Sequence, residues 1–267
     1  MIPRILAIAG SDSGGGAGIQ ADIKTITMLG GHAMTAITAI TAQNSLGVQS
    51  VFAIPIEEIA AQVRAVSDDL GVDAVKIGML ATGEIVLAVR DMLRATNVPI
   101  VVDPVMVATS GAALNAEGTA AAMPALFEIA TLITPNMPEL AVLSGLPVED
   151  EAGMAKAGQA LAARHRCAIL AKGGHMAGAE VVDLLIEADG AITRWSGSKI
   201  ETRHSHGTGC TLSSAIATGL GAGRPLIDAV AAARDYVRAA LLAAPGLGAG
   251  HGPMGHGLGR AYFPHPA

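Results

Sequence analysis

Residues 5–40 of the chain are ILAIAGSDSGGGAGIQADIKTITMLGGHAMTAITAI. Two apolar runs, at residues 5–9 and 33–40, lie on either side of a stretch with helical character at residues 17–29. A glycine-rich segment joins the first run to the helical stretch. This order predicts a strand, a turn, a helix and a second strand, which is the βαβ unit of a parallel sheet.

The same alternation continues through most of the chain and predicts an α/β fold with a mostly parallel sheet. Further strands are expected at residues 74–77, 100–103, 132–134 and 168–171, and helices at residues 56–70, 83–96, 116–129, 138–144, 151–166, 210–221 and 226–243. Between residues 181–187 and 191–196, Ala188-Asp189-Gly190 predicts a hairpin turn, and therefore an antiparallel edge. Because no interdomain linker, internal repeat or charge block occurs, we expect residues 1–267 to form one domain.

The composition argues against several classes of function. Hydrophobic residues make up 51% of the chain and charged residues 15%, so a large core can be buried. Aromatic residues are 2% and the net charge is −6 without any basic run, so we expect no nucleic-acid partner. The two cysteines, Cys167 and Cys210, show no CxxC or Cys/His spacing, which argues against a disulfide scaffold and a zinc site.

The N-terminal segment and the length of the apolar runs indicate a soluble, cytoplasmic protein. Residues 1–15 carry one arginine and a very short apolar run before the glycines, a pattern typical of a buried first strand rather than a signal peptide. No apolar stretch approaches the roughly 20 residues that a membrane span needs, so we expect no membrane partner.

Polar or glycine-rich segments follow the predicted strands. In an open parallel sheet, ligands bind beyond the carboxyl ends of the strands, so these segments are where a site is expected. In chain order they are residues 10–16 (GSDSGGG), 41–44 (TAQN), 78–79 (GM), 103–106 (DPVM), 135–139 (PNMPE) and 172–175 (KGGH). Such groups suit a polar small-molecule substrate.

The strongest functional signal is residues 206–215, HGTGCTLSSA. Gly207 and Gly209 flank Thr208 and lead directly into an expected helix. Glycines let the backbone approach a ligand, and the free N–H groups of a first helical turn favour an anion such as a transferring phosphoryl group. Cys210 would lie in that turn, where the pKa of a thiol tends to fall. An ordinary helix start with a small buried cysteine stays open as an alternative.

The N-terminal glycine cluster gives a weaker signal. Gly14, Gly16 and Gly18 do not fit the dinucleotide-binding pattern GxGxxG cleanly, and no GxxxxGK[ST] motif occurs. Residues 11–15, SDSGG, superficially resemble a serine-protease motif, but the βαβ context argues against that chemistry. A flexible loop or one that covers the substrate also fits this segment.

Four polar residues after the later strands are candidates for holding Mg-ATP. Asp103 and Glu139 could arrange Mg²⁺, with Asn136 beside them, because Mg²⁺ usually binds a few carboxylates, waters and the substrate's phosphates. Residues 136–139, NMPE, are equally a good helix start with an Asn N-cap. Lys172 follows an apolar strand and precedes two glycines, so it could reach a phosphate or be an ordinary strand-end lysine.

The histidines are less informative. His204 and His206 are two residues apart and no third ligand is visible, so a metal site there is not favoured. His251 and His256 lie in a Gly- and Pro-rich tail beyond Pro245, where we expect them to be solvated or to pack the loop.

Seven segments resemble the hydroxymethylpyrimidine/phosphomethylpyrimidine kinase family of thiamin biosynthesis, a branch of the ribokinase superfamily. They are AIAGSDSGGGAGIQADIKT, ITAITAQNSLGVQSV, VKIGML, VVDPVM, LITPNMPE, LAKGGH and HGTGCTLSSAIA, all between residues 7 and 217, and GHGPMGH in the tail is also similar. The resemblance implies a ribokinase-like three-layer sandwich with a mostly parallel sheet, an antiparallel edge and helices on both faces. It also implies a homodimer.

The implied activity is transfer of the ATP γ-phosphate to the hydroxymethyl group of 4-amino-5-hydroxymethyl-2-methylpyrimidine, and then a second transfer onto the monophosphate. Gln43 would hydrogen-bond the aminopyrimidine, since an amide carries donors and an acceptor. The other implied substrate-binding residues are Gly10, Asp22 and Met79. The remaining implied roles are the anion hole at Gly207, Thr208, Gly209 and Cys210, Mg²⁺ at Asp103 and Glu139 with Asn136, and ATP at Lys172, Asn136, Thr208 and Gly209.

The resemblance leaves two points open. Cys210 stands where sugar kinases of the superfamily carry an aspartate base, so a thiolate there could take the substrate's proton, or the side chain could only pack. Many relatives carry a lysine or histidine between the first glycines of the tail, whereas this chain has Ala249, which leaves the nucleotide contacts of the tail in doubt. Pyridoxal kinase is the rival enzyme. A non-catalytic sensor would be expected to lose part of the transfer centre, which is complete here.

Overall fold

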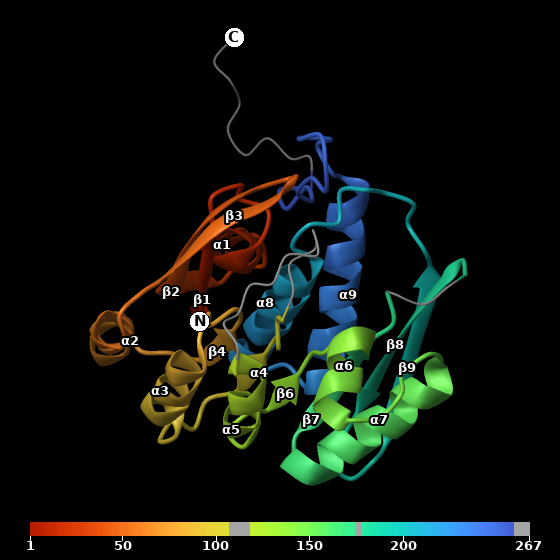
Figure 1. Cartoon of the computed structure of the whole chain (residues 1–267), viewed down its shortest axis with the longest axis horizontal. Helices are drawn as coiled ribbons and strands as arrows, with labels where there is room; N and C mark the ends of the chain where they lie inside the picture. Colours follow the sequence, from red (N-terminus) through yellow and green to blue (C-terminus); the bar gives the residue numbers. More distant parts are fainter. Residues whose placement is uncertain (107–117, 175–177, 259–267) are drawn as a thin grey trace.

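The computed structural model describes residues 1–106, 118–174 and 178–258. Across these residues, nine strands form one sheet in the order β3-β2-β1-β4-β5-β6-β7-β8-β9 (Figure 1). The strands β2, β1, β4, β5, β6 and β7 are parallel, whereas β3, β8 and β9 run antiparallel to their neighbours. Their bounds are β1 Arg4–Asp12, β2 His32–Asn44, β3 Gly47–Ala53, β4 Ala74–Ile77, β5 Ile100–Val102, β6 Leu132–Ile133, β7 Ala168–Lys172, β8 Glu180–Ile186 and β9 Ile192–Ser198.

Helices cover both faces of the sheet, as expected for a three-layer α/β sandwich (Figure 1). One face carries α1 Gly18–Met28, α8 Thr208–Gly221 and α9 Leu226–Leu242. The other carries α2 Ile56–Asp69, α3 Gly83–Leu93, α4 Thr119–Ala122, α5 Pro124–Phe127, α6 Met137–Ser144 and α7 Glu151–His165.

The central strands contribute to both cores because successive side chains of a strand point to opposite faces. Val101 of β5 packs in the core under α8 and α9, and Val102 in the core under α3 and α7. The same division separates Ile5 from Leu6 in β1. Burial on both faces explains why these strands are short, nearly continuous apolar runs, which the sequence predicts well.

The two edges of the sheet differ from the expectation in one respect. The antiparallel edge formed by β8 and β9 is confirmed. At the other edge β2 continues to Asn44 and returns through β3, which the sequence did not predict. Strand β3 has no buried residue, so it lacks the apolar alternation by which strands are found.

The helix expected at residues 116–129 is wrong in part. Residues 116 and 117 lie outside the described residues, and the remainder forms two short helices, α4 and α5. The break falls at Met123-Pro124, with Pro124 at the first position of α5, because proline cannot continue the hydrogen bonding of a preceding helix.

No helix in the described part of the chain combines the length and the apolar character needed to cross a membrane. The cytoplasmic location stays a prediction.

Candidate active site

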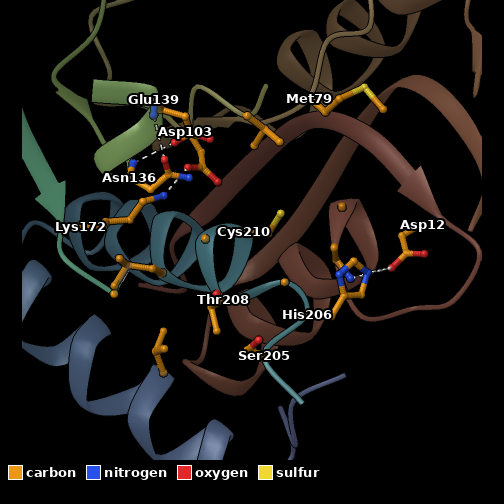
Figure 2. A pocket seen from close by; sticks show the side chains of 18 of the residues that line it. Asp12, Met79, Asp103, Asn136, Glu139, Lys172, Ser205, His206, Thr208 and Cys210 are labelled. Atoms are coloured by element: carbon orange, nitrogen blue, oxygen red, sulfur yellow. Dashed lines mark hydrogen bonds and ion pairs between the residues drawn. The ribbon is translucent and has the colours of Figure 1, made fainter. Parts of the chain in front are cut away.

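A cavity of about 740 Å³ opens at the carboxyl edge of the parallel strands. In Figure 2, Thr208 and Cys210 lie between two polar groups, which are Asp103, Asn136, Glu139 and Lys172 on one side and Asp12 and His206 on the other. The predicted site residues that line the cavity are Gly10, Gln43, Met79, Asp103, Asn136, Glu139, Lys172, Gly207, Thr208, Gly209 and Cys210. The fold therefore brings together eleven of the twelve residues proposed from the sequence.

The 207–210 turn sits at the N-terminus of α8. Gly207 is the N-cap with a left-handed φ of 85°, and a Cβ there would overlap the carbonyl oxygen of Gly16. Only glycine fits both constraints without strain. The Thr208 N–H donates to the carbonyl oxygen of Ser205 at 3.3 Å, which orders the entry into the helix. A Cβ at Gly209 would lie 3.1 Å from Asp103 Oδ2 and 3.3 Å from Lys172 Nζ, so the turn closely approaches that pair.

Asp103 and Lys172 form an ion pair beside the turn. Lys172 Nζ donates to Asp103 Oδ1 at 2.9 Å, and Thr134 Oγ1 donates to the same oxygen at 3.1 Å. Burial alone would lower the pKa of Lys172, but the neighbouring carboxylates outweigh it and raise that pKa. Lys172 is therefore a cation held at the strand end, where a phosphate could meet it.

Asn136 and Glu139 cap a helix and also line the cavity. They form a capping box at the start of α6, in which Asn136 Oδ1 accepts from the Glu139 N–H and Glu139 Oε2 accepts from the Asn136 N–H. Both residues also line the cavity. Burial raises the pKa of Glu139 to about 7, although Lys172 acts in the opposite direction.

The residues on this side of the cavity fit Mg²⁺ bound together with a phosphate ligand. Among the described residues, no group of three or more His, Cys, Asp or Glu side chains is arranged to hold a metal ion alone. Asp103 and Glu139 offer two carboxylates that line the same part of the cavity as Lys172. Mg²⁺ commonly uses one or two carboxylates and completes its shell with waters and substrate phosphates.

Gln43 and Met79, the residues predicted to bind the substrate, both line the cavity. The Gln43 backbone is clamped by Ser13, whose hydroxyl donates to the Gln43 carbonyl at 2.6 Å and accepts from its N–H at 2.8 Å. The Met79 carbonyl accepts from Gly10 N–H at 3.1 Å and from Thr38 Oγ1 at 2.7 Å. A Cβ at Gly10 would press against the Met79 side chain, so Gly10 makes room for it.

Asp22 is the predicted site residue that is not among those lining the cavity, and its contact with the substrate stays a prediction. Its side chain is fully buried in an ion pair with Lys76 at 2.9 Å, and it accepts from Ser214 Oγ at 2.7 Å. Burial raises the pKa of Asp22, which the Lys76 ammonium opposes. This pairing was not predicted from the sequence, because Lys76 lies in a buried strand, where a hydrophobic residue is the usual choice.

The expected fall in the pKa of Cys210 is wrong. Burial raises the pKa of this thiol to about 11, and Lys76 only partly offsets the effect. A position in a first helical turn favours a thiolate, but here desolvation is the larger influence. At neutral pH Cys210 is therefore a thiol in the unliganded protein.

Sequence reasoning missed an apolar wall at the far side of the cavity. It is formed by Val181, Ile200, Leu212, Val237 and Leu241, from β8, α8, α9 and the loop after β9. No short motif marks these residues, because they come from separate elements and resemble ordinary core positions.

The tail packs against α8 near the site. His256 is buried, its Nε2 lies 3.0 Å from Thr211 Oγ1, and its carbonyl accepts from Tyr236 Oη at 2.8 Å. His251 is exposed. Of the two tail histidines, His256 therefore has the loop-packing role and His251 the solvated one.

Comparisons with known proteins agree with one another over nearly the whole chain. A family model described as phosphomethylpyrimidine kinase matches residues 12–255. A hydroxymethylpyrimidine/phosphomethylpyrimidine kinase of Rhizobium meliloti is 50% identical over 255 residues, which are 94% of this chain and 96% of that protein.

Two solved structures share the fold. The crystal structure of phosphomethylpyrimidine kinase from Clostridium difficile has a TM-score of 0.79 at 38% identity, covering 89% of this chain and 98% of that one. The ADP complex of Bacillus subtilis pyridoxal kinase has a TM-score of 0.89 at 34% identity, covering 97% of this chain and 98% of that one.

Proposed function

Since the chain belongs to the phosphomethylpyrimidine kinase family, we propose that its cavity transfers the γ-phosphate of ATP to 4-amino-5-hydroxymethyl-2-methylpyrimidine and then to the resulting monophosphate. One observation carries this proposal: the 207–210 turn at the start of α8 lies between the Gln43–Met79 side and the Asp103–Lys172 side of one cavity. A phosphoryl group at that turn would meet a substrate hydroxyl on one side and ATP on the other.

The backbone of the turn is the proposed anion hole. The first N–H groups of a helix have no acceptor inside the helix, and the helix dipole adds positive potential. With the Thr208 N–H directed to Ser205, the N–H groups of Gly209 and Cys210 are the donors that we assign to the transferring group. Their positions are fixed by the fold before the substrate arrives, which is what makes such donors effective in a transition state.

ATP would lie along the other half of the cavity. Lys172 is placed to meet its phosphates, and the wall of Val181, Ile200, Leu212, Val237 and Leu241 offers an apolar slot for the base. Asp103 and Glu139, with Asn136 beside them, would hold Mg²⁺. When bound, Mg²⁺ neutralises charge on the phosphates.

Gln43 and Cys210 act on the acceptor substrate in this proposal. The Gln43 amide hydrogen-bonds the polar edge of the aminopyrimidine ring, and Met79 and Gly10 shape the pocket around it. Cys210 takes the hydroxymethyl proton as the substrate oxygen attacks the γ-phosphorus. Its raised pKa makes the thiolate scarce at neutral pH but strongly basic when it forms.

Pyridoxal is the second candidate substrate, and a specific observation favours it. The Bacillus subtilis pyridoxal kinase matches this chain with a TM-score of 0.89. Gln43 fits the polar edge of either ring, so the fold and the amide do not by themselves separate the two substrates.

ADP release from the purified protein with Mg-ATP tests the proposal, with hydroxymethylpyrimidine, its monophosphate and pyridoxal compared at equal concentrations. We expect turnover with both pyrimidines and little with pyridoxal. A preference for pyridoxal would contradict the proposed substrate and support the second candidate.

We also propose that the protein is a homodimer. Four large apolar side chains of the β2–β3 hairpin are exposed: Ile40 by 52%, Leu46 by 71%, Val51 by 38% and Phe52 by 66%. Ile40 and Phe52 are cross-strand partners and so lie on the same face of the hairpin. A second copy of the chain is the occupant that we assign to this face.

A further inference from the structure

His206 joins the two loops that flank the substrate side of the cavity. Its Nε2 lies 2.9 Å from Asp12 Oδ2 and 2.9 Å from Gln43 Nε2 (Figure 2 shows the bond to Asp12). The ring is almost fully buried, and a Cβ at Gly16 would collide with it. The side chain just before the 207–210 turn thus contacts the residue proposed to recognise the ring.

The state of Asp12 determines what His206 does. Asp12 Oδ2 accepts from the N–H groups of Gly16 at 2.9 Å and Ala17 at 2.8 Å, and Oδ1 accepts from Gly14 N–H at 2.8 Å. Burial acts to raise the pKa of Asp12, but the hydrogen bonds from His206 and from these backbone groups outweigh it and lower that pKa. Asp12 is therefore a carboxylate, and a carboxylate can only accept.

It follows that His206 carries a hydrogen on Nε2 and directs it toward Asp12. The Gln43 amide lies equally close to Nε2, so its oxygen can share this hydrogen, whereas its NH₂ group would meet another N–H donor and be repelled. The favourable orientation of the Gln43 amide therefore has Oε1 against His206, which a half-turn about the last side-chain bond provides. Gln43 Nε2 then faces the cavity with its two hydrogens.

We propose that His206 is a positioning residue for substrate recognition, which fixes the Gln43 amide with its oxygen toward His206 and its NH₂ group toward the substrate. The NH₂ group would donate to the ring nitrogen beside the 4-amino group of the aminopyrimidine. The inference rests on the proposed role of Gln43. The new element is His206, which determines whether the oxygen or the NH₂ group of Gln43 faces the substrate.

The contacts of His206 also predict which substrate binds more weakly when this residue is replaced. Asp12, Gln43 and His206 form one chain of polar contacts from the glycine loop to the end of β2, on the acceptor side of the cavity. The ATP side, with Asp103 and Lys172, makes no hydrogen bond with these three residues among the bonds described. A loss of His206 should therefore weaken pyrimidine binding and leave ATP binding nearly unchanged.

A double-mutant cycle tests the proposal, using His206→Asn, Gln43→Ala and the double variant, with kcat and the KM of hydroxymethylpyrimidine and of ATP measured for each. We expect His206→Asn to raise the KM of the pyrimidine about tenfold, the cost of about one lost hydrogen bond. Its kcat and its KM for ATP should stay within about twofold of wild type, and in the Gln43→Ala background it should add less than about twofold. His204→Asn, at a neighbouring histidine outside the cavity, is the control.

Two results would overturn it: equal effects of His206→Asn with and without Gln43, or a change confined to kcat and the KM of ATP. An unchanged pyrimidine KM in Gln43→Ala alone would instead refute the role of Gln43 on which the inference rests.

Gln43→Glu tests the orientation with His206 left in place, and serves if His206→Asn fails to fold. Glutamate keeps an oxygen toward His206 but loses the donor to the ring, so its pyrimidine KM should rise as much as that of Gln43→Ala. A KM near wild type would mean that the amide offers its oxygen to the substrate, which contradicts the proposal.

Discussion

At the scale of single residues, the environment of a side chain decides its chemistry more than its place in a motif does. Cys210 occupies a first helical turn, yet burial raises its pKa to about 11. The motif could be found from the sequence, but the desolvation depends on α1, β4 and α8 meeting around the thiol. The contacts of His206 with Asp12 and Gln43 were likewise not predicted, because these residues lie 194 and 163 positions away in the chain.

If Cys210 is the general base, kcat should rise with pH. Below a pKa of about 11 the thiolate fraction grows about tenfold for each pH unit, so kcat with hydroxymethylpyrimidine should increase between pH 7 and pH 9. Cys210→Ala should lower kcat by about 10²–10⁴ with little change in KM and should remove this slope. Steady-state kinetics at saturating Mg-ATP measures both effects. A Cys210→Ala enzyme with wild-type turnover would leave the 207–210 backbone as the catalytic element.

Lys76 and Asp22 predict a large effect on stability from a single buried charge. Both side chains are fully buried, so Lys76→Met would leave an unpaired carboxylate and lower the free energy of unfolding by about 3–5 kcal/mol. Adding Asp22→Asn should recover part of the loss, since the neutral amide costs less to bury. Urea denaturation gives the values. Arg4→Met, which breaks the exposed ion pair with Asp73, is the control and should cost much less.

At the scale of helices and strands, the sequence predicts best where an element is buried on both sides. The strands β1, β4, β5 and β7 are found within a few residues because their side chains enter both cores. Strand β3 is missed because its exposed faces carry no apolar pattern, and the division between α4 and α5 is missed although Pro124 marks it. Strand ends also locate most of the site, since six parallel strands deliver their following residues to one edge.

The contact of the tail with α8 makes stability depend on pH. Burial lowers the pKa of His256 to about 4, below the value near 6.5 of an unfolded histidine. Between about pH 6.5 and pH 4, His256 is therefore protonated in the unfolded chain but neutral in the folded one. The stability that comes from burying the neutral ring is complete above about pH 6.5 and is lost as the pH falls toward 4. The lowered pKa of His256 predicts that the free energy of unfolding falls by about 3 kcal/mol between pH 6.5 and pH 4.

His256→Gln isolates this effect because glutamine keeps a polar partner for Thr211 but does not titrate. The difference in unfolding free energy between pH 7 and pH 5, measured in urea, should be smaller in this variant than in the wild type. Comparing variants cancels other titrating groups, such as Glu139. His251→Gln, in the exposed part of the tail, should keep the wild-type slope.

At the scale of the whole molecule, the family resemblance predicted the three-layer fold, which the alternation of strands and helices alone does not specify. Alternating strands and helices predict an α/β sheet, but the strand order and the antiparallel β2–β3 edge depend on contacts between distant segments. The surroundings of Asp22 also depend on distant segments, because its partners Lys76 and Ser214 lie 54 and 192 residues away.

The exposed face of the β2–β3 hairpin predicts how the dimer can be split. Phe52→Glu would place a charge directly opposite Ile40, so the protein should elute with the mass of one chain instead of two in size-exclusion chromatography with light scattering. Ile192→Glu, an exposed position on β9 at the opposite edge of the sheet, should leave the dimer intact. A wild-type protein with the mass of one chain would contradict the dimer.

The late position of the 207–210 turn has a consequence for the synthesis of the enzyme. A ribosome synthesises β1 through β9 before it reaches Gly207, so Gln43 in β2, Asp103 just after β5 and Lys172 in β7 are made first. A growing chain that stops before this point would hold every side chain we assign to the pyrimidine, Mg²⁺ and ATP phosphates except Cys210, yet have no donors for the transferring group. The donors for the transferring phosphoryl group are thus added only after all nine strands of the sheet have been made.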